Sequence, residues 1–200
     1  MTRFVTCVGC IGVLMTLTLA APVPKGIKQA NDYYPLRVGD KWEYVRNENA
    51  DQVWVEEVSS VETVDGARLG TVRIQPSNPN AVAYDTKYKA DRIGWSFHSH
   101  GEMLYDPPSL FVKADLQAGD SWESTYRFVN TDYQVTVTVG EPERVSVPAG
   151  TFTAIPITTA YTSPAGRRPF TNWYVSGIGM IKQVANGRIT QELKAFTSGK

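Results

Sequence analysis

Apolar and polar residues alternate along most of this 200-residue chain, which is the pattern of a strand with one buried and one solvated face. Residues 133–139 show it best, because three valines alternate there with Gln and Thr. Beyond the N-terminal segment, apolar residues do not recur with the helical period of 3.6. Asp65-Gly66 and Asn186-Gly187 are the clearest hairpin turns. The sequence therefore predicts an antiparallel all-β protein of about eleven strands, with at most one or two short helices.

The stretch from residue 99 to residue 121 is the least regular part of the chain. Pro107-Pro108 lacks two backbone N–H donors, so we expect no central strand there. Ser109 is a residue type that caps helices, and it predicts one or two helical turns through Lys113. The strand pattern as a whole fits a curved sheet or half-barrel, a sandwich and a closed barrel alike.

The N-terminus has the composition of a secretory signal over residues 1–20. A positive charge precedes an apolar run that ends in small residues, which suits a peptidase cut after Ala20. The run has about 16 residues, which is short for a membrane-spanning helix of roughly 20. Two alternatives are an uncleaved anchor and a lipoprotein signal, although Cys7 and Cys10 stand near the beginning of the run rather than at its end.

A cut after Ala20 removes both cysteines, so the mature chain would form no disulfide. Lys and Arg together number 20, as do Asp and Glu, so no excess of positive charge points to nucleic acid or an anionic membrane. No second long apolar run follows, and we expect no further membrane span. A single domain over residues 33–197 is predicted, held together by packing alone.

Short sequence segments of the first half of the chain recur in the second half. Segments 36–43 and 116–123 share Leu, Gly, Asp, Trp and Glu at equivalent positions. Two further pairs of similar segments follow in the same order, 64–66 with 147–150 and 86–94 with 171–179. Such self-similarity predicts two pseudo-repeats, about 36–98 and 116–196, linked by 99–115.

The Gly-Asp-x-Trp pattern shared by segments 36–43 and 116–123 has a structural explanation. Gly-Asp makes a turn in which the Asp side chain can bond to nearby backbone. The Trp two residues later begins a strand and points inward, where an indole can bury roughly 150–250 Å². We expect Trp42 and Trp122 to be buried at the starts of equivalent strands.

Catalytic motifs are missing from the sequence. A phosphate-binding loop and a nucleophile elbow are both absent, so we expect no enzyme and no cofactor. One constellation resembles a metal site: His98-x-His100-x-Glu102, because alternate strand residues share a face roughly 6.5–7 Å apart and suit zinc. Asp106 would be a fourth ligand. We prefer the alternative of an exposed strand end without metal, because Gly101 is expected to end the strand.

Aromatic residues offer a second candidate surface. Tyr84, Tyr88 and Trp95 lie close together on an expected hairpin, where their rings could stack on a sugar. Ordinary packing between aromatic residues on neighbouring strands explains the same pattern, and we prefer that explanation.

Three motifs carry a resemblance to a known group of proteins. They are Tyr34-Pro-Leu-Arg-Val-Gly-Asp-Lys-Trp-Glu-Tyr44, Val147-Pro-Ala-Gly-Thr-Phe152 and Tyr174-Val-Ser-Gly-Ile-Gly-Met-Ile-Lys182. Together they resemble the PL-x-x-G-x-x-W-x-Y start, P-A-G-T-F turn and G-V-G-x-(I/V)-K segment of uncharacterised bacterial exported β-rich proteins. At the level of fold that group is similar to the half-barrels of lipoprotein carriers, which implies an acyl chain on a concave face. No binding residue is carried across from the carriers.

These observations predict an exported, monomeric, non-catalytic protein of the bacterial periplasm or exterior. It would bind an apolar or amphipathic envelope component, such as a lipid, in a concavity of the sheet. The main alternative is a structural or protein-interaction module of the envelope without a small ligand. A glycan-binding or metal-dependent activity comes third.

Overall fold

The computed structural model describes residues 33–47, 49–78 and 80–200, and the predicted signal segment lies outside these residues. The described chain forms thirteen β-strands and no helix. The strands are β1 (Lys41–Arg46), β2 (Asn49–Val64), β3 (Ala67–Pro76), β4 (Tyr84–Ala90), β5 (Gly94–His100), β6 (Met103–Lys113), β7 (Ser121–Phe128), β8 (Thr131–Val139), β9 (Glu143–Val147), β10 (Gly150–Ser163), β11 (Gly166–Val175), β12 (Gly179–Ala185) and β13 (Arg188–Thr197). Across the described ranges, therefore, there is no helix with the length and apolar character needed to span a membrane.

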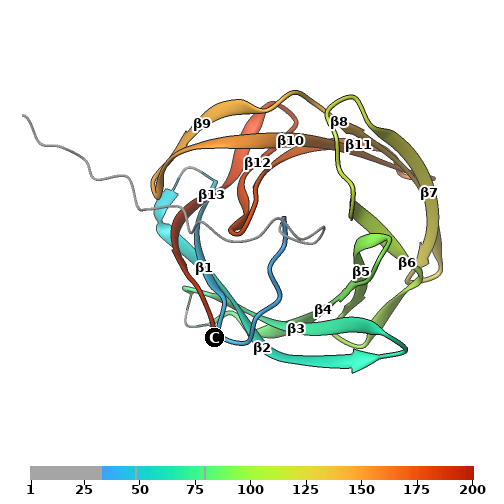
Figure 1. The fold of residues 1–200 in the computed structure, drawn as a ribbon, viewed down its shortest axis with the longest axis horizontal. Coiled ribbons are helices and arrows are strands. Elements are labelled where there is room, and N and C mark those ends of the chain that lie inside the picture. Colours follow the sequence, from blue (N-terminus) through green and yellow to red (C-terminus); the bar gives the residue numbers. More distant parts are fainter. Residues whose placement is uncertain (1–32, 48, 79) are drawn as a thin grey trace, which may run out of the picture.

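The strands form one antiparallel sheet that closes on itself, as Figure 1 shows in a view through the ring. β1 pairs with both β2 and β13, and the order then follows the chain from β2 to β8. β10 joins β8 to β11, so that twelve strands make a closed barrel, while β9 pairs with β10 alone. The predicted antiparallel all-β fold is confirmed. The sheet is a closed barrel rather than a half-barrel or a sandwich, because pairing its two ends gives partners to edge N–H and C=O groups.

The prediction of a helical turn at 109–113 is wrong. These residues belong to β6, where Ser109, Leu110 and Val112 pair with β5. The expectation of no central strand at Pro107-Pro108 is also wrong, because these residues lie inside β6, between β5 and β7. They belong to a stretch that does not pair with β5, and a single bridge, Asp106 to Arg127, joins β6 to β7. Proline fits this strand because the ladder is already interrupted there and no N–H donor is needed.

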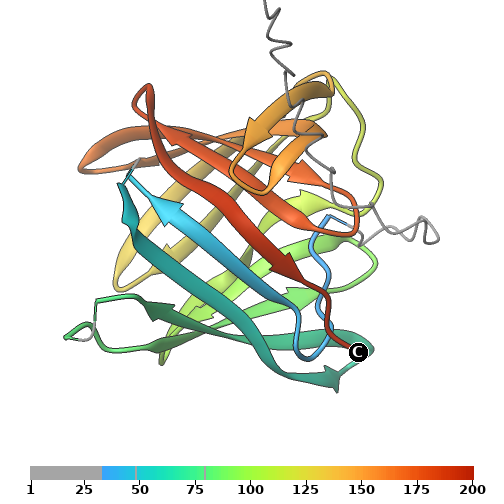
Figure 2. The same cartoon turned by 90° about the vertical axis from the view of Figure 1, so that its left-hand side faces the viewer.

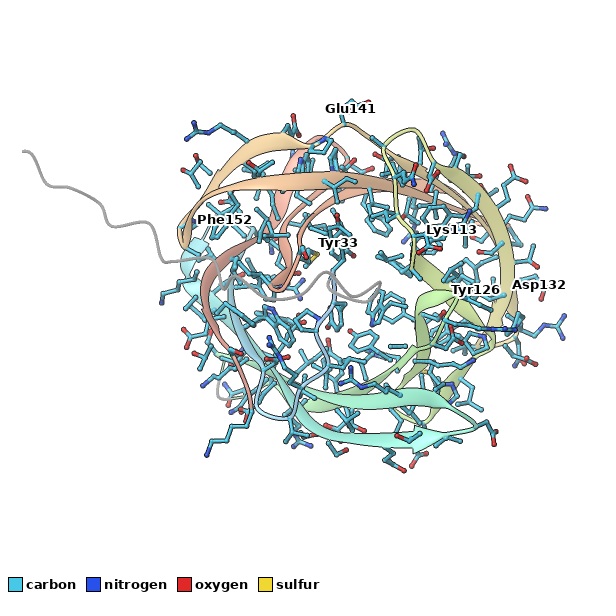
Figure 3. The ribbon with its side chains drawn as sticks, in the orientation of Figure 1. Tyr33, Lys113, Tyr126, Asp132, Glu141 and Phe152 are labelled. Carbon is cyan, nitrogen blue, oxygen red and sulfur yellow. The ribbon has the colours of Figure 1, made fainter. Side chains whose placement is uncertain are left out.

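The two ends of the barrel differ. One end, called the mouth below, carries the six hairpin turns β1–β2, β3–β4, β5–β6, β7–β8, β10–β11 and β12–β13, which gather on the left of Figure 2. Residues 33–40, called the plug, precede β1 and lie across the other end. Tyr34 of the plug is buried among the rings of Trp42 and Trp95, with centroids 5.5 and 4.4 Å away. Figure 3 shows Tyr33 near the centre of the ring of strands.

The expected tryptophan anchors are confirmed as buried residues. Trp42 and Trp122 are the second residues of β1 and β7, and they are 1% and 9% exposed. The Trp42 Nε1–H donates to the carbonyl of Ile178 at 2.6 Å, which ties β1 to the turn before β12.

The two Gly-Asp turns have similar local geometry. Gly39 and Gly119 both have a φ of 87°. In each turn the Asp carboxylate accepts a hydrogen bond from the backbone N–H three residues earlier, at 2.9 Å for Asp40 and 3.0 Å for Asp120. The duplication of whole halves stays a prediction. The segment 99–115, which was expected to link them, contains all of β6.

Candidate functional site

The barrel interior contains a cavity of about 360 Å³. Tyr34 of the plug lines it at one end, and inward-facing residues of nearly every strand of the barrel form the rest of its lining. This volume falls within the range of roughly 300–1,000 Å³ that small-molecule sites occupy in proteins. The cavity has two chemically different walls, one aromatic and one polar.

The aromatic wall comes from β4, β5, β6 and β7, whose alternate residues point inward. Phe97 lies at its centre, with ring centroids 5.2 Å from Trp95, 4.4 Å from Phe111 and 5.5 Å from Tyr105. Tyr105 continues the contact to Tyr126 at 5.2 Å. Rings at these separations pack edge-to-face or offset, so they form one continuous apolar surface.

The polar wall comes from β11, β12, β13, β1 and β2. Its polar members are Asn172, Gln183, Gln191, Arg46 and Glu56, and the same strands also contribute Tyr44, Phe170, Tyr174 and Met180 to the lining. These residues occupy inward positions of strands that border one another around the ring, which gathers them on one side of the cavity. The interior is therefore amphipathic rather than uniformly apolar.

Glu56 is the buried carboxylate of this wall, and it is 8% exposed. The Gln191 Nε2 donates to its Oε1 at 3.4 Å, which is a long hydrogen bond. Burial raises the pKa of the Glu56 carboxyl above its ordinary value of 4.5, while nearby Arg46 and the bond from Gln191 act in the opposite direction. The carboxylate is thus only partly compensated by its surroundings.

Arg46 lies nearer the mouth, on β1. Its guanidinium carbon is 4.1 Å from the ring centroid of Trp54, a cation–π contact. Its Nε is buried and has no hydrogen-bond partner among the described residues. The Oδ1 of Asn172 is likewise buried without a partner, although its Nδ2 donates to the Tyr174 hydroxyl at 3.3 Å. The polar wall therefore offers unused donor and acceptor capacity to the cavity.

Tyrosine hydroxyls complete the lining. Burial is the main cause that raises the pKa of Tyr34, Tyr44 and Tyr88 well above the ordinary value of 10. The carboxylate of Glu56 adds to the effect at all three. These side chains stay neutral at physiological pH, so they act as hydrogen-bonding groups and not as bases.

The structure separates the residues of the predicted metal constellation. His100 faces the interior cavity, with its Nδ1 3.4 Å from the Thr86 hydroxyl, whereas His98 lines a different hollow of about 530 Å³ together with Lys89. Glu102 is exposed in the β5–β6 turn, and Asp106 lines a third hollow. The cause is an irregular register between residues 97 and 99, which breaks the simple alternation of faces. No group of three or more His, Cys, Asp or Glu residues in the described part of the chain is placed to hold a metal.

The aromatic residues singled out in the sequence do come together. Tyr84, Tyr88 and Trp95 all line the interior cavity, and the rings of Tyr88 and Trp95 are 4.8 Å apart. Sequence reasoning missed Glu56 as a site residue. The signal that could have identified it is its position two residues before Val58, an apolar residue that is buried on the same strand face.

Comparisons with known proteins show similarity of fold. No protein-family model matches the chain, and no curated protein matches it. A presumed exported protein with a YmcC-like fold from Bacteroides fragilis is 12% identical, with a TM-score of 0.53 over 84% of this chain and 100% of its own. A presumed lipoprotein from Parabacteroides distasonis is 14% identical, with a TM-score of 0.50 over 84% of this chain and 99% of its own. At these identities the likeness concerns the fold alone.

Proposed function

We propose that this chain is an exported, non-catalytic protein that binds an apolar or amphipathic small molecule inside its barrel. The observation that carries the proposal is the cavity of about 360 Å³ with one aromatic and one polar wall. A purely structural barrel would fill this space with side chains, since protein interiors are normally close-packed. Buried polar atoms without partners, such as the Nε of Arg46, also favour a site that a ligand completes.

Export and an envelope ligand are supported by two observations. The segment 1–20 has the composition of a secretory signal. Proteins of similar fold are described as a presumed exported protein and a presumed lipoprotein. A ligand from the envelope would be amphipathic, which matches the two walls of the cavity.

Binding of the uncharged dye N-phenyl-1-naphthylamine to the purified protein tests this proposal. We expect a saturable rise in dye fluorescence with one site per chain, because the dye enters the aromatic side of the cavity. Thr86 lines the cavity and is 2% exposed, so Thr86→Trp should fill the site and weaken binding at least tenfold.

The matched control is Thr138→Trp, which makes the same change at an exposed position of β8. It should leave dye affinity unchanged. Circular dichroism and thermal unfolding would establish that both variants are folded. Dye binding that is absent, or that the two variants affect equally, would contradict an interior site and favour a structural module of the envelope without a small ligand.

A further inference from the structure

Two opposite charges face the interior cavity without pairing with each other. Glu56 and Arg46 both line it, yet no ion pair joins either of them to another described residue. The guanidinium of Arg46 lies over Trp54, and the carboxylate of Glu56 has one long hydrogen bond, from Gln191. Glu56 is buried and Arg46 is partly buried with its Nε enclosed, and charges removed from water in proteins are ordinarily paired, so this arrangement leaves room for charges supplied by a ligand.

The two charges lie at different depths. Glu56 is opposite Trp42 in the β1–β2 ladder, close to the plug, whereas Arg46 ends β1 at the mouth. The buried Oδ1 of Asn172 is a second acceptor, it has no partner among the described residues, and its side chain is 3% exposed. The polar wall therefore has spare acceptor capacity at Glu56 and Asn172 and spare donor capacity at Arg46, near the mouth.

From this arrangement we infer that the interior site takes a ligand with a primary ammonium and an anionic group on one apolar body. The ammonium would donate to Glu56 and Asn172, the anionic group would accept from Arg46, and the apolar body would lie on the aromatic wall. A primary ammonium has N–H donors that a quaternary ammonium lacks, and the two acceptors need donors. The inference rests on the proposed function and names the ligand chemistry of that site.

Two sources supply this chemistry, amino acids with apolar side chains and phosphoethanolamine head groups of lipids. Isothermal titration with four phenyl compounds tests the charges separately: L-phenylalanine carries both, 2-phenylethylamine the ammonium, 3-phenylpropanoate the anion, and 3-phenylpropan-1-ol neither. Dihexanoylphosphatidylethanolamine and dihexanoylphosphatidylcholine test the lipid source, since only the first has N–H donors. We expect L-phenylalanine in the first set, or dihexanoylphosphatidylethanolamine in the second, to bind at least tenfold more tightly than its matched compounds.

Substitutions then assign each charge to a residue. Glu56→Gln should weaken binding of L-phenylalanine and 2-phenylethylamine about tenfold and leave 3-phenylpropanoate unchanged. Arg46→Gln should weaken binding of L-phenylalanine and 3-phenylpropanoate about tenfold and leave 2-phenylethylamine unchanged. Glu57→Gln is the matched control, because Glu57 is the exposed neighbour of Glu56 on β2. If the lipid is the tighter source, the same two variants should weaken dihexanoylphosphatidylethanolamine.

The outcomes separate this inference from the proposed function. Equal affinity within both ligand sets, or no binding of either set by a protein that binds the uncharged dye, overturns the inference and leaves the binding function standing. Failure to bind the dye removes the binding function itself. The ligand series on the wild-type protein stands without any variant, and retained dye binding shows that each variant is folded.

Discussion

Burial links the ionisation of Glu56 to the folding of this barrel. It is a carboxyl group in a largely aromatic interior, and desolvation disfavours its charged form. Its pKa in the folded protein lies above the ordinary value of 4.5, which means that the folded state holds a proton at pH values where the unfolded state has released it. The stabilising proton is bound in full below the unfolded pKa, and stability falls as the pH rises through the folded pKa.

Replacing Glu56 by Gln should therefore stabilise the unliganded protein at pH 8 but not at pH 4. The gain should be about 1.4 kcal/mol for each unit by which folding raises the pKa. Urea unfolding of wild type and variant at the two pH values measures it, and the difference cancels contributions that both proteins share. Glu57→Gln should change neither value. A Gln variant that is less stable at pH 8 would show that the ionised carboxylate is better compensated than its surroundings indicate.

At the scale of elements, the contact between β6 and β7 is the weakest in the ring. Only Asp106 and Arg127 pair there, whereas the β2–β3 ladder runs without a gap longer than one residue from Trp54–Pro76 to Val64–Ala67. The prolines of β6 contribute to this because they supply no N–H. Tyr126 lines both the interior cavity and the hollow beside Asp106, so it lies between these two spaces at the β6–β7 contact, which is called the seam below.

Local opening should consequently begin at the β6–β7 seam. In hydrogen exchange, the amides of β7 that do not bond to β8 should exchange at least a hundredfold faster than amides of the β2–β3 ladder. Nuclear magnetic resonance of the amide protons resolves the two sets. Equal protection of both sets would mean that packing of Tyr105, Tyr126 and Phe128 holds the seam as firmly as a hydrogen-bonded ladder does.

At the scale of the whole molecule, the plug packs against the core of the barrel. Leu36 is 1% exposed, and it packs against Gly70 of β3. A Cβ placed on Gly70 would lie 2.8 Å from the Cδ2 of Leu36, which is closer than such atoms approach in proteins. A side chain at this position would therefore have to displace the buried Leu36 of the plug, whereas no turn calls for the glycine.

A double-mutant cycle should reveal this coupling. Leu36→Ala should cost about 2–5 kcal/mol through the cavity it leaves. Gly70→Ala should destabilise the wild type by about 1–3 kcal/mol, because of the overlap with Leu36, but should cost little in the Leu36→Ala background. Urea unfolding of the four proteins measures the coupling. Strict additivity would contradict a direct contact between the plug and β3.

Local patterns in the sequence determined the strands, the hairpin turns and some of the buried residues of this protein. Alternating residues predicted strands, Asp65-Gly66 and Asn186-Gly187 predicted turns, and the Gly-Asp-x-Trp pattern predicted buried Trp42 and Trp122. Each of these features depends on a few neighbouring residues, so each is visible in one dimension. The aromatic residues Tyr84, Tyr88 and Trp95 were readable as a cluster for the same reason.

Only the tertiary structure decided closure and the composition of the cavity. Closure depends on pairing β13 with β1, whose residues are separated by most of the chain. Irregular register near residue 98 placed His98 and His100 in different surroundings, and an unpaired stretch let β6 contain two prolines. Glu56, Asn172 and Gln191 come together because the ring brings β2, β11 and β13 around one space. The sequence shows which residues alternate, but which faces turn inward and meet depends on contacts between distant strands.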